Sequence, residues 1–241
     1  MRYLIQKKSL GGMPAQEFGC SVVEAVNEQL WLHPDSGLSF SMQTSCCFEK
    51  DGLKPDVVPV GSVEFCLAWY RGMGAGLIRP LNIPKCLWPM VKRTIFEGDG
   101  QAAADASGAY FAKDVNRIKA PWNGPYRASL GAHRMQFAQI VPDIVAEWRC
   151  FVSKGAIVDV RCYAGDPWRI PEKEYCKQAA ATLGQTNPAF TLDVLVRENG
   201  ETDLLECHDF FACGLYGFSD GRMLLRMLRD TQRHLLAQCA K

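Results

Sequence analysis

Two pairs of apolar segments, each joined by a short turn, dominate the second half of the sequence and restrict its fold more than any other feature. The four segments are AEWRCFV at 146–152, AIVDVRCY at 156–163, FTLDVLV at 190–196 and DLLECHDF at 203–210. Their β-branched and aromatic residues favour strands, and turns as short as SKG at 153–155 connect antiparallel neighbours. The pattern predicts an antiparallel sheet rather than a doubly wound parallel one.

Helical patterns accompany these strands, so the predicted fold class is α+β. A further strand is expected in AYFAKDV at 109–115, and VVPVGS at 57–62 opens a predicted βα unit. Helices are expected over 63–71, over 171–183 and after Asp220.

The proline-containing connection IRPLNIP at 78–84 divides the chain, because residues before proline favour extended backbone. We place the boundary near Pro80. The predicted divisions are an N-terminal lobe at 1–80 and a larger domain at 81–241, whose smaller lobe is 81–140 and whose antiparallel-sheet lobe is 141–241.

Composition restricts the classes of function. The chain has 27 Lys plus Arg and 26 Asp plus Glu, so its net charge of +1 makes nucleic-acid binding an unfavoured function. No apolar run approaches the roughly 20 residues that cross a bilayer, and the N-terminus lacks a signal-peptide core. We therefore expect a cytoplasmic protein without a membrane partner. Eleven scattered cysteines without a CxxC pair indicate reduced thiols.

Charged residues interrupt three of the apolar strands. Arg149, Asp193 and Glu206 each stand among apolar neighbours. Any one of them alone is compatible with a structural role. An unpaired charge inside an apolar strand is strongly unfavourable, however, so the three together predict a common partner or a bound ion.

The acidic and basic residues of these strands form two sets. Glu206 and His208 are two apart and share a strand face, and Asp193 reaches them from the neighbouring strand of the hairpin. The candidate cations are Lys113, Lys119, Arg149 and Arg161. Oxygen ligands for Mg²⁺ and cations around a triphosphate are the groups that phosphoryl transfer needs.

Two ordered motifs resemble those of a known family. The stretches EWRCFVSKGAIVDVRCYAGDP and FTLDVLVRENGETDLLECHDFFACGLYG resemble motifs of the ATP-grasp superfamily, and within it of the small R2K-type domains of bacteria and phages. The resemblance implies an ATP-grasp fold, in which two α+β lobes grip ATP and a short pre-ATP-grasp lobe precedes them. It also implies a bacterial or phage-infected host cytoplasm.

The activity implied by this resemblance is ATP-dependent ligation of a carboxylate to an amine through an acyl phosphate, with ADP and phosphate as products. ATP and Mg²⁺ would be the cofactors. The carboxylate and the amine could belong to small molecules, peptides or proteins. Two alternatives are an ATP-grasp phosphotransferase and a non-catalytic ATP-binding protein, and a homodimer is an assumption that no residue supports.

The resemblance also assigns roles to the two charged sets. Lys113 would contact the α and β phosphates, Arg149 and Arg161 would face the γ phosphate and the acyl phosphate, and Asp193 and Glu206 would bind Mg²⁺. His208 stands where the family usually has Asn, and imidazole suits transition metals better than magnesium. Either Asp209 or water replaces that ligand, or His208 accepts a different metal, or the activity is altered.

The remaining roles concern the nucleotide. The adenine would meet backbone groups of Gln139, Ile140 and Val141, and the ribose would meet Asp143 or Glu147. Lys119, with Arg117 and Trp122, would close over the triphosphate. Lys92 or Arg93 would be an early nucleotide contact, although VKRTIF at 91–96 is also compatible with a helix that exposes its charges.

Overall fold

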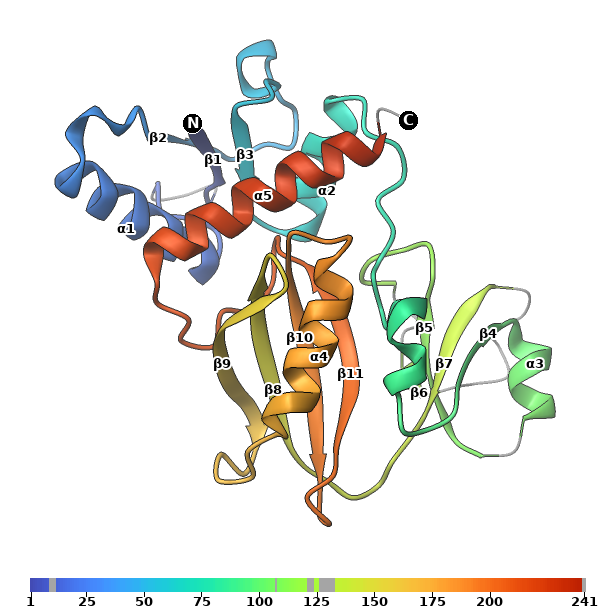
Figure 1. The fold of residues 1–241 in the computed structure, drawn as a ribbon. Helices are drawn as coiled ribbons and strands as arrows, with labels where there is room; N and C mark the ends of the chain where they lie inside the picture. The colour runs from blue at the N-terminus through green and yellow to red at the C-terminus, as the bar shows by residue number, and fades with distance from the viewer. Residues whose placement is uncertain (9–11, 107, 121–123, 126–132, 240–241) are drawn as a thin grey trace. The chain divides into compact units, whose positions relative to one another are not determined.

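The computed structural model describes residues 1–8, 12–106, 108–120, 124–125 and 133–239, which form two compact units (Figure 1). The first unit comprises Met1–Ile78 and Phe210–Lys241, and the second comprises Arg79–Asp209. The boundary after Ile78 lies beside the boundary expected at Pro80. By their contacts, residues 210–241 belong with the N-terminal segment, so the compact units differ at the C-terminus from the domain division at 1–80 and 81–241, which stays a prediction.

The first unit is built on a three-stranded parallel sheet of order β2-β1-β3. Its elements are β1 (Arg2–Gln6), α1 (Glu17–Leu32), a 3-10 turn (Pro34–Ser36), β2 (Ser39–Gln43), a 3-10 turn (Lys50–Gly52), β3 (Val57–Val60), α2 (Val63–Gly72) and α5 (Gly221–Cys239). The Ser62 hydroxyl accepts a hydrogen bond from the Phe65 amide and caps α2. The βα unit and helix expected from residue 57 onward are therefore confirmed.

The C-terminal helix α5 explains why the end of the chain joins the first unit. Its Leu224, Leu228 and Leu235 are buried, and α5 packs against α1. The Tyr3 hydroxyl also donates to the backbone oxygen of Leu225 at 3.0 Å. The helix expected after Asp220 is thus present, with its apolar face on the N-terminal segment.

The second unit contains two four-stranded antiparallel sheets. The larger has the order β11-β10-β8-β9 and the smaller the order β4-β7-β5-β6. The elements are a 3-10 helix (Lys85–Met90), β4 (Ile95–Gly98), α3 (Gly100–Asp105), β5 (Tyr110–Asp114), β6 (Gly124–Pro125), β7 (Met135–Gln139), β8 (Ile144–Ser153), β9 (Ala156–Gly165), α4 (Lys173–Gly184), β10 (Ala189–Arg197) and β11 (Thr202–Asp209). The five strands expected here, the two hairpins and the helix at 171–183 are confirmed.

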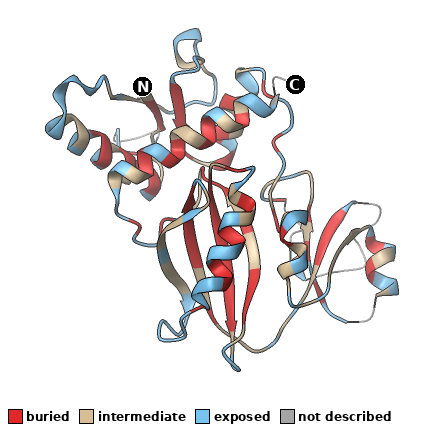
Figure 2. Ribbon diagram, in the orientation of Figure 1, coloured by how far each residue is buried: buried red, intermediate tan, exposed pale blue. Residues whose placement is uncertain are grey.

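One face of the larger sheet packs against α4. This core contains Cys150 and Val152 of β8, Leu192 and Val194 of β10, and Leu204 of β11, together with residues of the helix. Figure 2 shows β10 buried along nearly its whole length, while the side of α4 turned away from the sheet is exposed. Because side chains alternate along a strand, residues 149, 191 and 193 are placed on the opposite face. The register shift of the β10–β11 pair between Asp193 and Val194 places Glu206 on that face as well.

The helix considered for VKRTIF at 91–96 is wrong. The 3-10 helix ends at Met90, and the chain then enters β4 at Ile95, which pairs with β7. Thr94, Ile95 and Phe96 are branched or aromatic residues that suit a strand better than a helix. Phe96 lies stacked on Phe137 of β7, with ring centroids 5.1 Å apart.

Candidate active site

The predicted acidic residues meet on the face of the larger sheet opposite α4. Asp193 of β10 lies directly across from Glu206 of β11, and Thr191 lies across from His208. Asp193, Glu206 and His208 each present a ligand atom, and these atoms all lie within 4.8 Å of one another. The three predicted metal ligands are therefore brought together. The two-residue period places Glu206 and His208 on one face, and a register shift between Asp193 and Val194 brings Asp193 across from Glu206.

Asp209, considered as a replacement ligand, points elsewhere. It pairs in register with Phe190, whose side chain belongs to the core beneath α4, and its carboxylate accepts a hydrogen bond from Asn187 at 3.3 Å. Burial raises the pKa of Asp209 to about 6. Burial lowers the pKa of His208 to about 4, so its imidazole is neutral at pH 7.

Two of the predicted cations pair with these acids. Arg149 of β8 donates from Nε and Nη2 to the carboxylate of Asp193 at 2.8 and 2.7 Å, and both side chains are buried. Lys113 of β5 forms an ion pair with Glu206. Burial lowers the pKa of Lys113 to about 8. The smaller sheet thus contributes a cation directly to the acids of the larger one.

A cavity of about 380 Å³ lies between the two sheets, and Lys113 and Glu206 are the members of this charged cluster that line it. Its polar lining comprises Arg93, Lys113, Gln136, Gln139, Glu147, Tyr163 and Glu206, and its apolar lining comprises Ile83, Phe111, Ala138, Ile140, Val141, Ile144, Leu195 and Leu205. A mostly apolar cavity of this size that also has polar groups in its lining is typical of a small-molecule site.

The segment between β7 and β8 forms one wall of the cavity. Gln139, Ile140 and Val141 line it, as predicted for the adenine contact. The Ile140 amide already donates to the Ala109 oxygen at 2.8 Å, and the Gln139 side chain accepts from the Thr94 amide at 3.3 Å. Within the described residues, no hydrogen bond engages the Val141 amide, which makes this amide the better candidate for a base contact.

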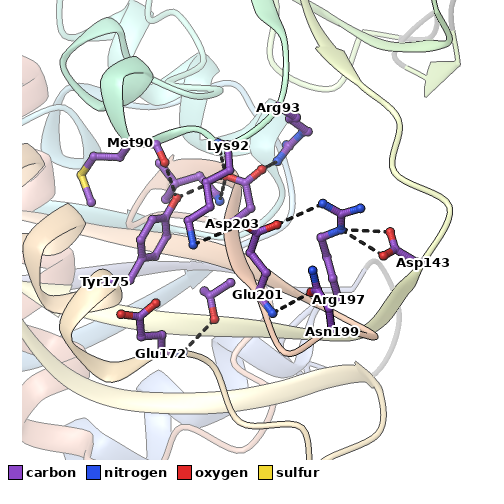
Figure 3. A network of polar contacts seen from close by, with 12 residues as sticks. Met90, Lys92, Arg93, Asp143, Glu172, Tyr175, Arg197, Asn199, Glu201 and Asp203 are labelled. Carbon is purple, nitrogen blue, oxygen red and sulfur yellow. Dashed lines mark hydrogen bonds and ion pairs between the residues drawn. The ribbon is translucent and has the colours of Figure 1, made fainter.

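Of the two ribose candidates, Glu147 is in the cavity and Asp143 is not. Asp143 accepts two hydrogen bonds from Nε of Arg197, at 3.0 and 3.1 Å, and Arg197 also pairs with Glu201 (Figure 3). Glu147 lines the cavity and is hydrogen bonded to Tyr163, whose pKa is raised by burial and by the nearby carboxylates. The geometry therefore favours Glu147.

Arg93 lines the cavity, and its guanidinium is fixed by an ion pair with Asp203. Its Nη1 lies 2.5 Å from Oδ2 of Asp203, and both side chains are almost fully buried. The other oxygen of Asp203 accepts from the Lys92 amide at 3.0 Å and from the Tyr175 hydroxyl at 3.2 Å (Figure 3). Asp203 and Tyr175 were not predicted as part of the site.

Three predicted cations lie outside the cavity lining, namely Arg149, which is paired with Asp193, Arg161 and Lys119. Arg161 of β9 lies opposite Arg149 in register, but it pairs with Asp159 at 2.7 Å and is partly exposed. Lys119 is exposed, with a φ of +53°. Trp122 lies outside the described residues. The predicted closure over a triphosphate by Lys119 is therefore not tested by these contacts.

Gln136 is a further cavity residue that the sequence analysis missed. It pairs in register with Lys113, and its amide both donates to the Ile83 oxygen at 2.8 Å and accepts from the Ile83 amide at 2.9 Å. These two hydrogen bonds fix the segment that contains Ile83. The preceding residue, Asn82, forms an isolated β-bridge with Cys207 of β11. The alternation in MQFAQ was the available signal, because Met135 and Phe137 face the small core and Gln136 does not.

Solved structures share the fold of this chain. A RimK domain ATP-grasp protein from Sphaerobacter thermophilus matches at 11% identity over 100% of both chains, with a TM-score of 0.54. The D-cycloserine synthetase DcsG matches at 12% identity over 97% of this chain and 99% of that one, with a TM-score of 0.59. A D-alanine–D-alanine ligase from Bacillus anthracis complexed with ATP matches at 10% identity over 98% of each chain, with a TM-score of 0.54.

The particular family follows from the sequence itself. Residues 91–225 match the family described as ATP-grasp domain, R2K clade family 2. This match covers more than half of the chain, so the protein belongs to that family. A search of curated proteins gives no match. The predicted family and the ATP-grasp α+β fold are confirmed. Among the described residues, no helix is both long and apolar enough to span a membrane.

Proposed function

We propose that this protein is an ATP-dependent carboxylate–amine ligase that forms an amide or peptide bond through an acyl phosphate. The observation that supports the proposal most is the convergence of Lys113 and Arg149 with Asp193, Glu206 and His208, a cluster whose Lys113 and Glu206 line the cavity. Such a group of charges can neutralise a triphosphate and the charge that moves during phosphoryl transfer.

The donor set fits a divalent cation, because two carboxylates and one imidazole can approach a single ion. In the proposed site Asp193, Glu206 and His208 hold the metal, which supplies charge neutralisation to the phosphates. Lys113 orients the α and β phosphates, and Arg149 orients the γ phosphate. Arg161 takes part in this scheme only after it leaves Asp159.

The cavity provides the rest of the proposed nucleotide site. The backbone of Gln139, Ile140 and Val141 bounds the adenine, and the carboxylate of Glu147 accepts from the ribose hydroxyls. Arg93 lies beside Lys113 in the lining and adds positive charge. The apolar wall excludes water from the reacting phosphates, which strengthens each charge contact.

The first experiment is ADP and phosphate release from ATP and Mg²⁺, measured with and without pooled amino acids and short peptides. We expect release that depends on an added amine and carboxylate. Arg149→Ala should reduce kcat/KM by about 10²-fold or more, because it removes a charge contact to the transferred group. Lys177→Ala, an exposed position on α4, is the matched control.

Product analysis separates the ligase from the alternatives. A new amide linkage in the product supports the ligase, whereas a stable phosphorylated acceptor without amine consumption supports the phosphotransferase. ATP binding without turnover in the presence of every acceptor pool supports the non-catalytic protein.

A further inference from the structure

The three metal-ligating side chains form a mixed oxygen and nitrogen set. Nε2 of His208 lies 2.8 Å from Oε1 of Glu206, and Asp193 lies across from Glu206 in the hairpin. Donors bound to one ion at about 2.1 Å are separated by roughly 3–4 Å. The ligand atoms lie within 4.8 Å of one another, so a small approach brings all three onto one ion.

A second and independent feature is the hydroxyl of Thr191. This side chain is fully buried, and its Oγ1 has no hydrogen-bond partner among the described residues. Thr191 lies directly opposite His208 and precedes Asp193 by two residues, so it shares the face of the metal ligands. An unsatisfied buried hydroxyl is unfavourable, and a water bound to an ion at this centre would satisfy it.

The identity of the third donor decides which ion the centre prefers. Carboxylates suit Mg²⁺, whereas a neutral imidazole nitrogen binds first-row transition ions better than it binds Mg²⁺. Asp209 does not compensate as an oxygen donor, because it lies on the α4 face with Asn187.

We propose that the Nε2 atom of His208 makes this centre selective for first-row transition ions over Mg²⁺, with a water held by Thr191 completing the site. Mn²⁺ is the probe, because it is paramagnetic and the member of that series nearest to Mg²⁺ in its ligand preference. The inference rests on the metal role assigned in the proposed function. It concerns this chain's own ligand, and it can be tested without turnover.

The experiment measures binding of Mn²⁺ to the full chain by electron paramagnetic resonance, with Mg²⁺ as competitor. We expect the spin-echo spectrum of wild-type protein to show nitrogen coupling to Mn²⁺ and that of His208→Asn to lack it. The Mn²⁺-over-Mg²⁺ affinity ratio should fall by about tenfold in His208→Asn, since an amide oxygen replaces the nitrogen. Bound Mn²⁺ without nitrogen coupling in the wild type, or an unchanged ratio, would overturn the inference.

Thr191→Val is the matched control, since it removes the hydroxyl with little change in volume. We expect it to weaken both ions alike and to leave the ratio unchanged. A loss of selectivity equal to that of His208→Asn would assign the selectivity to the pocket and refute the role of the imidazole. If His208→Asn fails to fold, the presence or absence of nitrogen coupling in the wild-type spectrum decides whether the His208 imidazole binds the ion.

Failure of the ligase proposal and failure of the metal inference give different experimental results. Nitrogen-coupled Mn²⁺ without acceptor-dependent ADP release removes the ligase and leaves the metal inference standing. Acceptor-dependent ADP release at a centre without nitrogen coupling removes the metal inference and leaves the ligase.

Discussion

Arg149 and Asp193 form a buried, two-bond ion pair across neighbouring strands β8 and β10. The pair occupies the carboxylate that the proposed metal site requires. Lys113 makes a corresponding pair with Glu206. Both carboxylates of the proposed metal centre are thus paired with cations of the proposed phosphate site. A nucleotide that takes up these cations makes the carboxylates more available to the metal ion.

This arrangement predicts that metal and nucleotide bind cooperatively. A nucleotide that draws Arg149 and Lys113 onto its phosphates leaves Asp193 and Glu206 available to the ion. We expect ADP to increase the affinity for Mn²⁺ by about 5- to 100-fold, and Mn²⁺ to increase that for ADP equally, because such coupling is reciprocal. Calorimetric titration with Mn²⁺ in the presence and absence of ADP, and with ADP in the presence and absence of Mn²⁺, measures this coupling. An affinity for either ligand that is unchanged by the other would contradict the prediction.

The same pair predicts a stability effect. Arg149→Ala leaves the Asp193 carboxylate buried without its main partner, which should lower the free energy of unfolding by about 3–5 kcal/mol. Removing both charges in Arg149→Met with Asp193→Leu should recover most of that loss. Thermal melts of the variants check this order, and a single variant as stable as the double one would be inconsistent with it.

Arg161→Ala is the control for that measurement. Arg161 lies next to Arg149 in register, but its pair with Asp159 is partly exposed. Exposed pairs contribute about 0–1 kcal/mol, so this variant should melt close to the wild type.

Thiol chemistry tests the prediction of reduced cysteines. None of the ten described cysteines is in a disulfide. Cys46, Cys47 and Cys86 are exposed, whereas Cys66 is buried and burial raises its pKa to about 12. Since the thiolate is the reactive form, we expect neutral alkylation to label the exposed thiols first and Cys66 only after denaturation. Peptide mapping by mass spectrometry measures the order, and early labelling of Cys66 would show that the helix α2 region opens.

The strand pattern predicted much of the site because a strand has a fixed two-residue period. Glu206 and His208 share a face by this period, and the predicted hairpin places the strand of Asp193 beside them. The register shift between Asp193 and Val194, which sets Asp193 directly across from Glu206, was not predicted. The apolar sequence around Arg149 similarly indicated a buried charge with a partner. These features are local, because they depend on the strand period and on neighbouring strands of one hairpin.

Contacts between distant segments could not be predicted in this way. Arg93 and Asp203 are 110 residues apart, and no local period relates them. Asp143 was predicted as a ribose ligand, but it pairs with Arg197. Residues 210–241 belong to the first unit because α5 packs on α1. Each of these contacts is determined by tertiary packing, which a local sequence pattern does not contain.

The Arg93–Asp203 pair leads to a prediction about nucleotide affinity. Asp203 holds the Arg93 guanidinium at the cavity wall, and it accepts from Lys92 and Tyr175 at the same time (Figure 3). Asp203→Asn keeps the shape but removes the charge that orients Arg93. Charged hydrogen bonds contribute about 1.5–3 kcal/mol, so the KM for ATP should rise by roughly tenfold or more while kcat changes less than about twofold. Tyr175→Phe removes only a neutral donor and should raise KM much less. If Asp203→Asn lowers kcat and leaves KM unchanged, Asp203 does not act through nucleotide binding and Arg93 has no role as a phosphate contact.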